Sequence, residues 1–221
     1  KGIIPSAAEA WAEKNAEKLR KCTADSLIAA AAVAVPAGIG ISVLAGPVLN
    51  VLFGSRPAET ALSVLPLEVL GTGVIFLSLT VPAFSVMQAS GMAGMPVRIM
   101  LMGVAVKLVL NCLLVPIPQL NVTGAAISTV VCYGIIFILA VYETHRYAGI
   151  KISDVLILIF KMVFCGLICG GAALLCYSIL TKTVDSALIL FAAIAFGGVF
   201  YIISTHLSGI LTKTTLKLLI C

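Results

Sequence analysis

The sequence predicts an all-α integral membrane protein, and three observations support this prediction. Of the 221 residues, 61% are hydrophobic and only 10% are charged, whereas about a quarter of the residues are charged in soluble domains. The mean hydropathy is +1.19. Several apolar stretches reach roughly 20 residues, enough to cross a hydrocarbon layer of about 30 Å as helices, and they lack the alternation of a membrane β-barrel.

The first segments of the chain precede the apolar spans. Residues 1–8 are expected to end a preceding helix, and residues 9–23 to form a cytoplasmic amphipathic connection, helical over 9–22. Glu17 and Lys21 lie four residues apart in this connection, a spacing at which opposite charges stabilise a helix. Because the chain opens on a lysine and not on an initiator methionine, we interpret it as a piece of a longer protein.

Residues 24–206 are predicted to form a bundle of about six transmembrane helices. Four prolines in the first two spans remove helix hydrogen bonds and predict bends: Pro36, Pro47, Pro66 and Pro82. After the bundle, residues 207–221 are predicted to form a cytoplasmic amphipathic tail. The six spans are expected at residues 24–53, 62–90, 96–118, 122–143, 154–180 and 184–206.

The basic residues predict the orientation of the spans. One set of connections carries most of the lysines and arginines, and the alternate connections carry only Arg56 and Lys182. By the positive-inside rule the first set is cytoplasmic. This set comprises Lys14, Lys18, Arg20, Lys21, Arg98, Arg146, Lys151, Lys213 and Lys217.

Composition and motifs also exclude several functions. The net charge of +5 lies at helix ends without interleaved aromatic residues, so it does not indicate a nucleic-acid partner. The seven cysteines form no paired CxxC motif, which argues against a disulfide framework and a metal site. Because no nucleophile with a base and no pair of carboxylates is found, we expect no enzyme activity, no catalytic residue and no cofactor.

Lys107 is the most informative polar residue, because it lies inside an apolar span. A charged amine in hydrocarbon costs at least about 2.5 kcal/mol, so it usually faces a protein interior or a wet cavity. Asn111 lies one helical turn away on the same face. Two interpretations remain open: a cation that faces the cavity and contacts phosphate or an acid, or a structural lysine that is paired within the helix packing.

Four further residues complete the candidate set. Arg98 precedes Lys107 by nine residues, near the cytoplasmic end, and Gln88 ends the second span. Thr129 lines the cavity or bonds a helix carbonyl. Glu68 is a candidate gating or coupling group, because an intramembrane carboxylate can carry a proton, although simple exposure near the interface is the alternative.

Three strings carry a family resemblance: "IIPSAAEAWAEKNAEKLRK", "AVPAGIGISVLAGPVLNVLFG" and "VKLVLNCLLVPIPQLNVTGAAISTVV". The first two resemble a helix junction in flippases of the multidrug, oligosaccharidyl-lipid and polysaccharide exporter superfamily. The third is similar to stage V sporulation protein B-type polysaccharide biosynthesis proteins and the related lipid II flippases. The resemblance covers roughly residues 3–180.

The resemblance implies the carboxyl-terminal lobe of a two-lobed, fourteen-helix transporter in the bacterial inner membrane. The implied function is to flip an undecaprenyl-linked oligosaccharide or lipid II by alternating access, as in cell-wall or sporulation pathways. The implied partners are the lipid-linked sugar, membrane lipids and the amino-terminal lobe of the same protein.

Coupling to sodium, to protons or to the membrane potential is open. An ammonium at Lys107 disfavours sodium at that position, since sodium needs oxygen ligands. The alternatives are a cation-coupled multidrug exporter of the same fold and a non-transporting membrane scaffold for cell-wall synthesis.

Overall fold

The computed structural model describes residues 3–150, 152–180 and 187–207, and this part of the chain folds into eight helices with no strand. Six of them, α2 and α4 to α8, are long and apolar enough to cross a membrane. The predicted helical bundle of about six spans is therefore confirmed. The helices are α1 (Ile3–Ala12), α2 (Ala16–Val43), α3 (Ala45–Phe53), α4 (Pro57–Ala89), α5 (Gly94–Leu114), α6 (Asn121–Ala148), α7 (Ile152–Leu180) and α8 (Ala187–Leu207).

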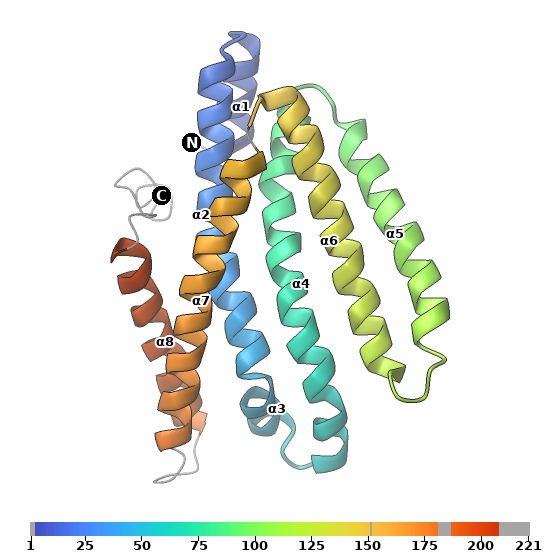
Figure 1. Cartoon of the computed structure of the whole chain (residues 1–221), viewed down its shortest axis with the longest axis vertical. Helices are drawn as coiled ribbons and strands as arrows, with labels where there is room; N and C mark the ends of the chain where they lie inside the picture. Colours follow the sequence, from blue (N-terminus) through green and yellow to red (C-terminus); the bar gives the residue numbers. More distant parts are fainter. Residues whose placement is uncertain (1–2, 151, 181–186, 208–221) are drawn as a thin grey trace.

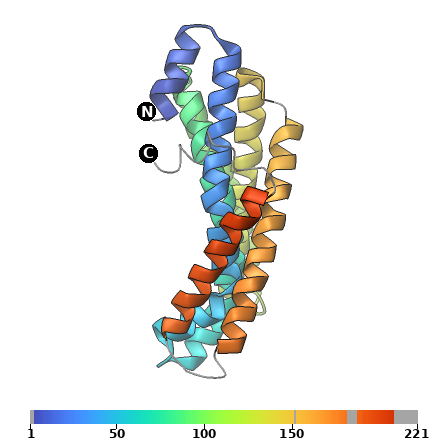
Figure 2. The ribbon, with the colours of Figure 1, turned by 90° about the vertical axis from the view of Figure 1, so that its left-hand side faces the viewer.

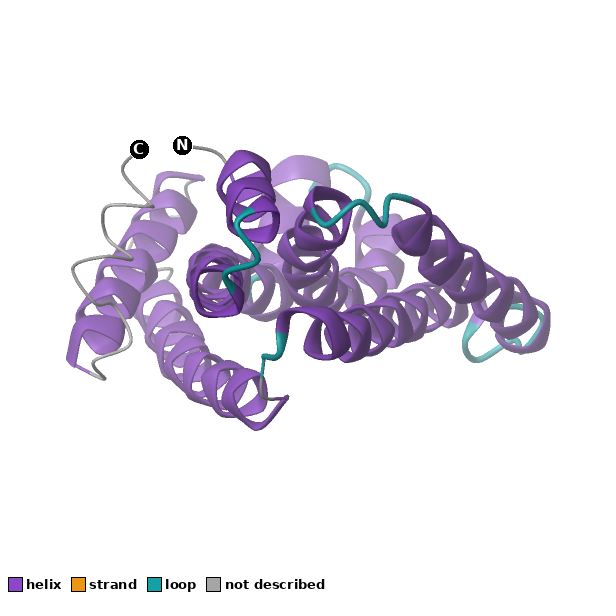
Figure 3. Cartoon of the chain, turned by 90° about the horizontal axis from the view of Figure 1, so that it is seen from above, coloured by secondary structure: helices purple, strands orange, loops and turns teal. Residues whose placement is uncertain are grey.

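The long helices stand side by side in a row (Figure 1). Their order across the row is α5, α6, α4, α2, α7 and α8, since each helix makes its main contacts with the next one in this order. Figure 3 shows that the row is curved, with α8 and α5 at its two ends. The short helix α1 packs beside α2 and α4 near one end of the bundle (Figure 2), and α3 packs against α4 at the other end.

Most lysines and arginines of the described part gather at the end of the bundle where α1 lies. Helices α2 and α5 begin at this end and α4 and α6 finish there, so their basic termini coincide. We call it the basic end, defined by Lys14, Lys18, Arg20, Lys21, Arg98 and Arg146. At the opposite end, the α3 end, Arg56 pairs with Glu59 at 3.3 Å.

The turn between α1 and α2 replaces the single helix expected over residues 9–22. Helix α1 ends at Ala12, and α2 begins at Ala16 and continues directly into the first span. The side chain of Asn15 accepts a hydrogen bond of 3.0 Å from the backbone N–H of Lys18, which caps α2 at this point. The connection is therefore a hairpin of two helices.

The first span also divides where one helix over 24–53 was expected. Helix α2 ends at Val43, and α3 starts anew at Ala45. Pro47 is the third residue of α3, a first-turn position where a proline removes no helix hydrogen bond. Pro36, Pro66 and Pro82 lie inside α2 and α4. Beyond Leu207, the predicted tail lies outside the described residues.

Buried side chains form two main clusters along the row. The larger cluster joins α1, α2, α4, α6, α7 and α8 around Val35, Leu79 and Met162. The smaller one joins α4, α5 and α6 around Met87 and Ile136. Because lipid is as apolar as these side chains, close backbone approach matters more here than in water.

The closest backbone approach holds α2 against α4. A Cβ added to Gly38 would lie 2.6 Å from the carbonyl oxygen of Gly71, so neither glycine has room for a side chain. Beside this crossing, the hydroxyl of Ser42 donates a hydrogen bond of 2.7 Å to the carbonyl of Glu68.

Candidate functional site

Lys107 lies on the face of α5 that packs on α6. Gly103, one turn before it, is buried against Ile136 and Cys132 of α6, where a Cβ would lie 2.6 Å from the Ile136 Cδ1 atom. Lys107 itself is half-buried and close enough to Cys132 for an electrostatic interaction. The lysine therefore sits along the seam between two helices and does not point freely into lipid.

Asn111 and Ser128 form a polar link across the same seam. The buried hydroxyl of Ser128 on α6 donates a hydrogen bond to the side-chain oxygen of Asn111 on α5. One residue further along α6, the Thr129 hydroxyl donates to the carbonyl of Ala125 at 2.8 Å. Close to the turn, a Cβ on Gly124 would lie 2.8 Å from the Leu114 carbonyl oxygen. The α5–α6 hairpin is thus fixed by close packing and one polar link.

The outer side of α5 is open. Only Pro96, Ile99 and Gly103 of this helix are buried, and its contact with α4 is slight compared with its contact with α6. Within the described residues, Lys107 forms no ion pair with a carboxylate. Its charge is consequently available to a group that approaches along α5.

The remaining predicted residues do not join this cluster. Arg98 and Gln88 are exposed near the basic end, whereas Glu68 is exposed in the half of α4 nearer the α3 end. Twenty residues of helix separate Glu68 from Gln88, which is about 30 Å at 1.5 Å per residue. The structure therefore places Lys107 and Asn111 along the α5–α6 seam, has Thr129 bond a carbonyl of its own helix, and distributes the other three along the bundle.

An apolar groove between α2, α7 and α8 was not anticipated from the sequence. Its volume is about 500 Å³, within the range of small-molecule sites. Small residues make up much of its lining: Ala32, Ala37, Gly40, Gly166, Gly170, Ala173, Gly197 and Gly198. The signal in the sequence is the GxxxG spacing of Gly166 and Gly170, which is typical of closely packed membrane helices. Side chains of α2 contact these two glycines, with Ile39 Cδ1 2.5 Å from a Cβ placed on Gly166.

One residue that lines this groove has a buried polar atom without a partner among the described residues. Tyr201 of α8 lines the groove, is 4% exposed, and has a buried hydroxyl without a hydrogen-bond partner in the described part of the chain. Two other buried oxygens share this property: the Ser90 hydroxyl at the end of α4 and the Glu143 Oε2 atom near the end of α6. The sequence offered a signal for Glu143, since it is an acid at the border of a predicted span.

Metal binding finds no support in the described residues, where no group of three or more His, Cys, Asp or Glu side chains is gathered. The features present are an apolar groove, a cation in a helix seam, and six spans with basic residues at one end. Together they define a multi-pass helical membrane protein with an apolar groove between three of its helices and a positive charge within one span.

The chain belongs to the lipid II flippase MurJ family, whose sequence model matches residues 2–195. It is 25% identical over 222 residues to the probable low-salt glycan biosynthesis flippase Agl15 of Haloferax volcanii, covering 99% of this chain and 44% of the relative. It is 24% identical over 218 residues to the lipid II flippase MurJ of Bacillus subtilis, covering 96% and 40%. The uncharacterized membrane protein YabM of Bacillus subtilis is 27% identical over 223 residues, covering 97% and 40%.

These relatives confirm the expected superfamily at the level of flippases. Flippases are transporters and not enzymes, which agrees with the expectation of no enzyme activity. The family and the six apolar helices together indicate a multi-pass protein of the cell membrane. The chain spans about two fifths of the length of the three relatives described above.

Proposed function

We propose that the chain is part of a flippase that moves a lipid-linked oligosaccharide across the cell membrane by alternating access. The cargo class is an undecaprenyl-linked oligosaccharide or lipid II, and the bacterial inner membrane is the proposed site of action. In this proposal the lobe works with an amino-terminal lobe of the same protein, driven by a sodium or proton gradient or by the membrane potential.

The observation that carries the proposal is the apolar groove between α2, α7 and α8. A lipid-linked sugar has a long hydrocarbon tail, which needs an apolar path, and an anionic sugar-bearing head, which cannot enter hydrocarbon without polar partners. The groove of about 500 Å³ offers an apolar path on the lobe itself. The small residues that line it leave room for a chain without moving a helix.

Lys107 is the proposed contact for the anionic head. It is a cation at membrane depth without an ion pair among the described carboxylates, and phosphate oxygens form strong charge-assisted hydrogen bonds with ammonium groups. The hydrogen bond from Ser128 to Asn111 holds against α6 the face of α5 that carries Lys107. In this proposal α5 and α6 present the charge, and α2, α7 and α8 hold the tail.

The experiment that tests the proposal fills the groove without straining the fold. A Cβ on Gly40 or Gly198 meets no atom within 4 Å, and both residues line the groove. Gly40→Leu and Gly198→Leu place a large side chain in that space, and they also remove helix glycines that are unfavourable by about 1 kcal/mol relative to alanine. Gly171→Leu is the matched control, because Gly171 on α7 is equally open and lies outside the groove.

The readout is complementation of a strain depleted of its lipid-carrier flippase by the full-length protein, at matched membrane abundance. We expect Gly40→Leu and Gly198→Leu to lose complementation and Gly171→Leu to retain it. If Gly40→Leu and Gly198→Leu retained complementation as Gly171→Leu does, a tail-binding role for the groove would be refuted. Failure of the wild-type protein to complement, together with no binding of an undecaprenyl pyrophosphate-linked sugar, would refute the flippase proposal itself.

A further inference from the structure

The turn between α1 and α2 has a conformation that suits glycine better than the lysine it carries. The backbone N–H of Asn15 donates to the carbonyl of Ala10, and the N–H of Lys14 donates to the carbonyl of Trp11, both at 3.0 Å. This is the hydrogen-bond pattern of a Schellman motif, and Lys14 occupies its left-handed position with φ 52°. Glycine is the usual residue there, since a Cβ is strained at positive φ.

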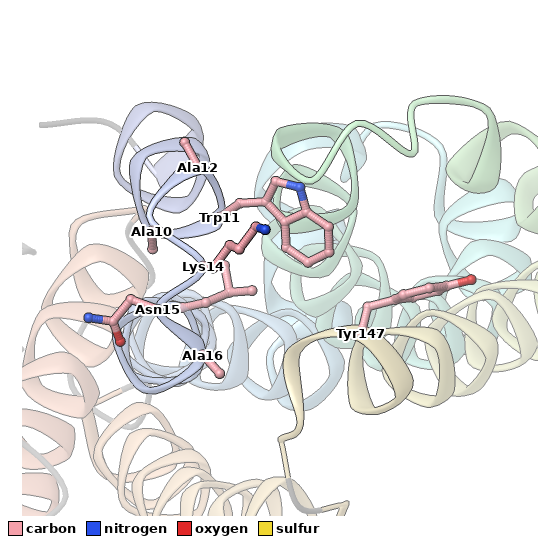
Figure 4. A pocket seen from close by; sticks show the side chains of 8 residues that line it. Ala10, Trp11, Ala12, Lys14, Asn15, Ala16 and Tyr147 are labelled. Atoms are coloured by element: carbon pink, nitrogen blue, oxygen red, sulfur yellow. The ribbon is translucent and has the colours of Figure 1, made fainter.

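The lysine side chain enters a pocket at the basic end. Trp11 and Lys14 project from the turn into the space between it and the end of α6, where Tyr147 lies (Figure 4). The pocket has a volume of about 510 Å³, and Leu19 and three alanines complete an apolar part of its wall. The pocket therefore combines one cation, two aromatic rings and an apolar part of its wall.

The charges around this pocket leave Lys14 unneutralised. Lys18 bonds Glu9 at 3.3 Å and Glu13 at 3.0 Å, so these two acidic residues already have a cationic partner. Glu17, in the first turn of α2, forms no ion pair with Lys14 among the described residues. Lys14 has no ion pair within the described part of the chain. The guanidinium of Arg146 lies 5.7 Å from the centre of the Tyr147 ring, which brings a second cation to the rim.

The depth of the pocket favours a lipid ligand. It lies where α2 begins and α6 finishes, at the level expected for lipid headgroups, and tryptophan and tyrosine are enriched at this level of membrane proteins. A free phosphate ion would use the lysine but would gain nothing from the two rings or the apolar wall. A phospholipid has both a phosphate and an apolar part next to it.

We propose that this pocket binds the phosphate-bearing headgroup of an anionic phospholipid from the adjacent leaflet. The Lys14 ammonium contacts the phosphate, and Trp11 and Tyr147 flank the glycerol and the first carbons of the acyl chains. The site is separate from the groove between α2, α7 and α8, and the inference holds whatever cargo the protein moves. It also gives a reason for a lysine at a position where glycine would be less strained.

The test uses a variant that should fold at least as well as the wild type. Lys14→Gly removes the charge and suits the positive φ, whereas Lys21→Ala removes a charge from the same end without touching the pocket. The full-length protein is titrated in detergent micelles with phosphatidylglycerol or phosphatidylcholine, and native mass spectrometry counts the lipid retained. A thermal melt of each variant checks the fold.

We expect one phosphatidylglycerol to bind the wild type more tightly than phosphatidylcholine. Lys14→Gly should weaken this binding about five- to tenfold, as for loss of one partly solvated charge-assisted hydrogen bond, without lowering the melting temperature. Lys21→Ala should bind as the wild type does. Equal weakening by both variants, or no preference for the anionic lipid, would overturn the proposal. Displacement of the lipid by millimolar inorganic phosphate would show that the site takes free phosphate.

Discussion

Gly71→Ala tests whether the crossing of α2 and α4 depends on direct backbone contact. A Cβ on Gly71 would lie 2.7 Å from the Gly38 carbonyl oxygen and 2.8 Å from the Ser42 backbone nitrogen, and it would also meet the Ser42 hydroxyl. The first two are backbone atoms, so a change of rotamer cannot relieve the contact. The two helices must move apart by several tenths of an ångström to reach an ordinary van der Waals distance.

The cost of this movement follows from three terms. Overpacking of a close contact costs about 1–3 kcal/mol. Loss of the hydrogen bond between Ser42 and the Glu68 carbonyl adds about 0.6 kcal/mol, a typical value between membrane helices. Replacing a helix glycine by alanine stabilises the folded protein by about 1 kcal/mol, because alanine has the higher helix propensity. The net expectation is a destabilisation of about 0.6–2.6 kcal/mol for Gly71→Ala.

The assay is thermal unfolding of the full-length protein in detergent. The quantity measured is the fraction of protein that remains monodisperse after heating to each temperature. Gly46→Ala is the matched control, because a Cβ on Gly46 meets no atom within 4 Å, and this variant should be as stable as the wild type or more so. If Gly71→Ala melted no lower than Gly46→Ala, the contact between the glycines of α2 and α4 would not be a determinant of stability, and the reasoning would be refuted.

Three further predictions concern the polar residues. Lys107→Ala should abolish complementation by the full-length protein and Lys107→Arg should retain it, because the charge is the proposed contact for phosphate; full activity of both would leave the lysine a structural role only. Asn111→Ala and Ser128→Ala should each destabilise the protein, because each removes the hydrogen bond across the α5–α6 seam. In thermal melts, a double-mutant cycle should give a coupling free energy of about 0.6 kcal/mol between the two substitutions, and additive effects would contradict this bond. Asp154→Asn should change stability by less than about 1 kcal/mol at low salt, since its pair with Arg20 at 3.5 Å is exposed, and a larger loss would mean that this contact ties α2 to α7.

The spans themselves were largely predictable from the sequence. Each of the six is marked by a run of apolar residues, and the cost of leaving such a run in water is a property of the run alone. The prediction of one continuous helix over residues 9–22 was wrong, because amphipathic spacing does not reveal a turn that contains a residue at positive φ. Lys14 carries no turn signal of the kind that glycine would give.

The candidate site was predictable only in part. The four-residue spacing of Lys107 and Asn111 placed them on one face of α5, and the structure adds Ser128 from α6 as the partner of Asn111. The sequence also proposed Arg98 from its spacing to Lys107, Gln88 from its place at the end of a span, and Glu68 as a separate gating group. The structure places Arg98 and Gln88 near the basic end and Glu68 in the other half of α4. The residue type indicates which interactions a side chain can form. Its position along the helix, and the neighbour that this face of the helix packs against, decide which groups it can contact.

The sequence by itself determined the class of protein, the number of spans and the end at which the basic residues gather. Those properties follow from transfer free energies and charge, which are summed over neighbouring residues of the chain. Only the tertiary structure decided the groove between α2, α7 and α8, the glycine contact of α2 with α4, and the pocket that joins Lys14 to Tyr147. Each of these brings together residues far apart in the chain, so it depends on which helix faces meet at close range.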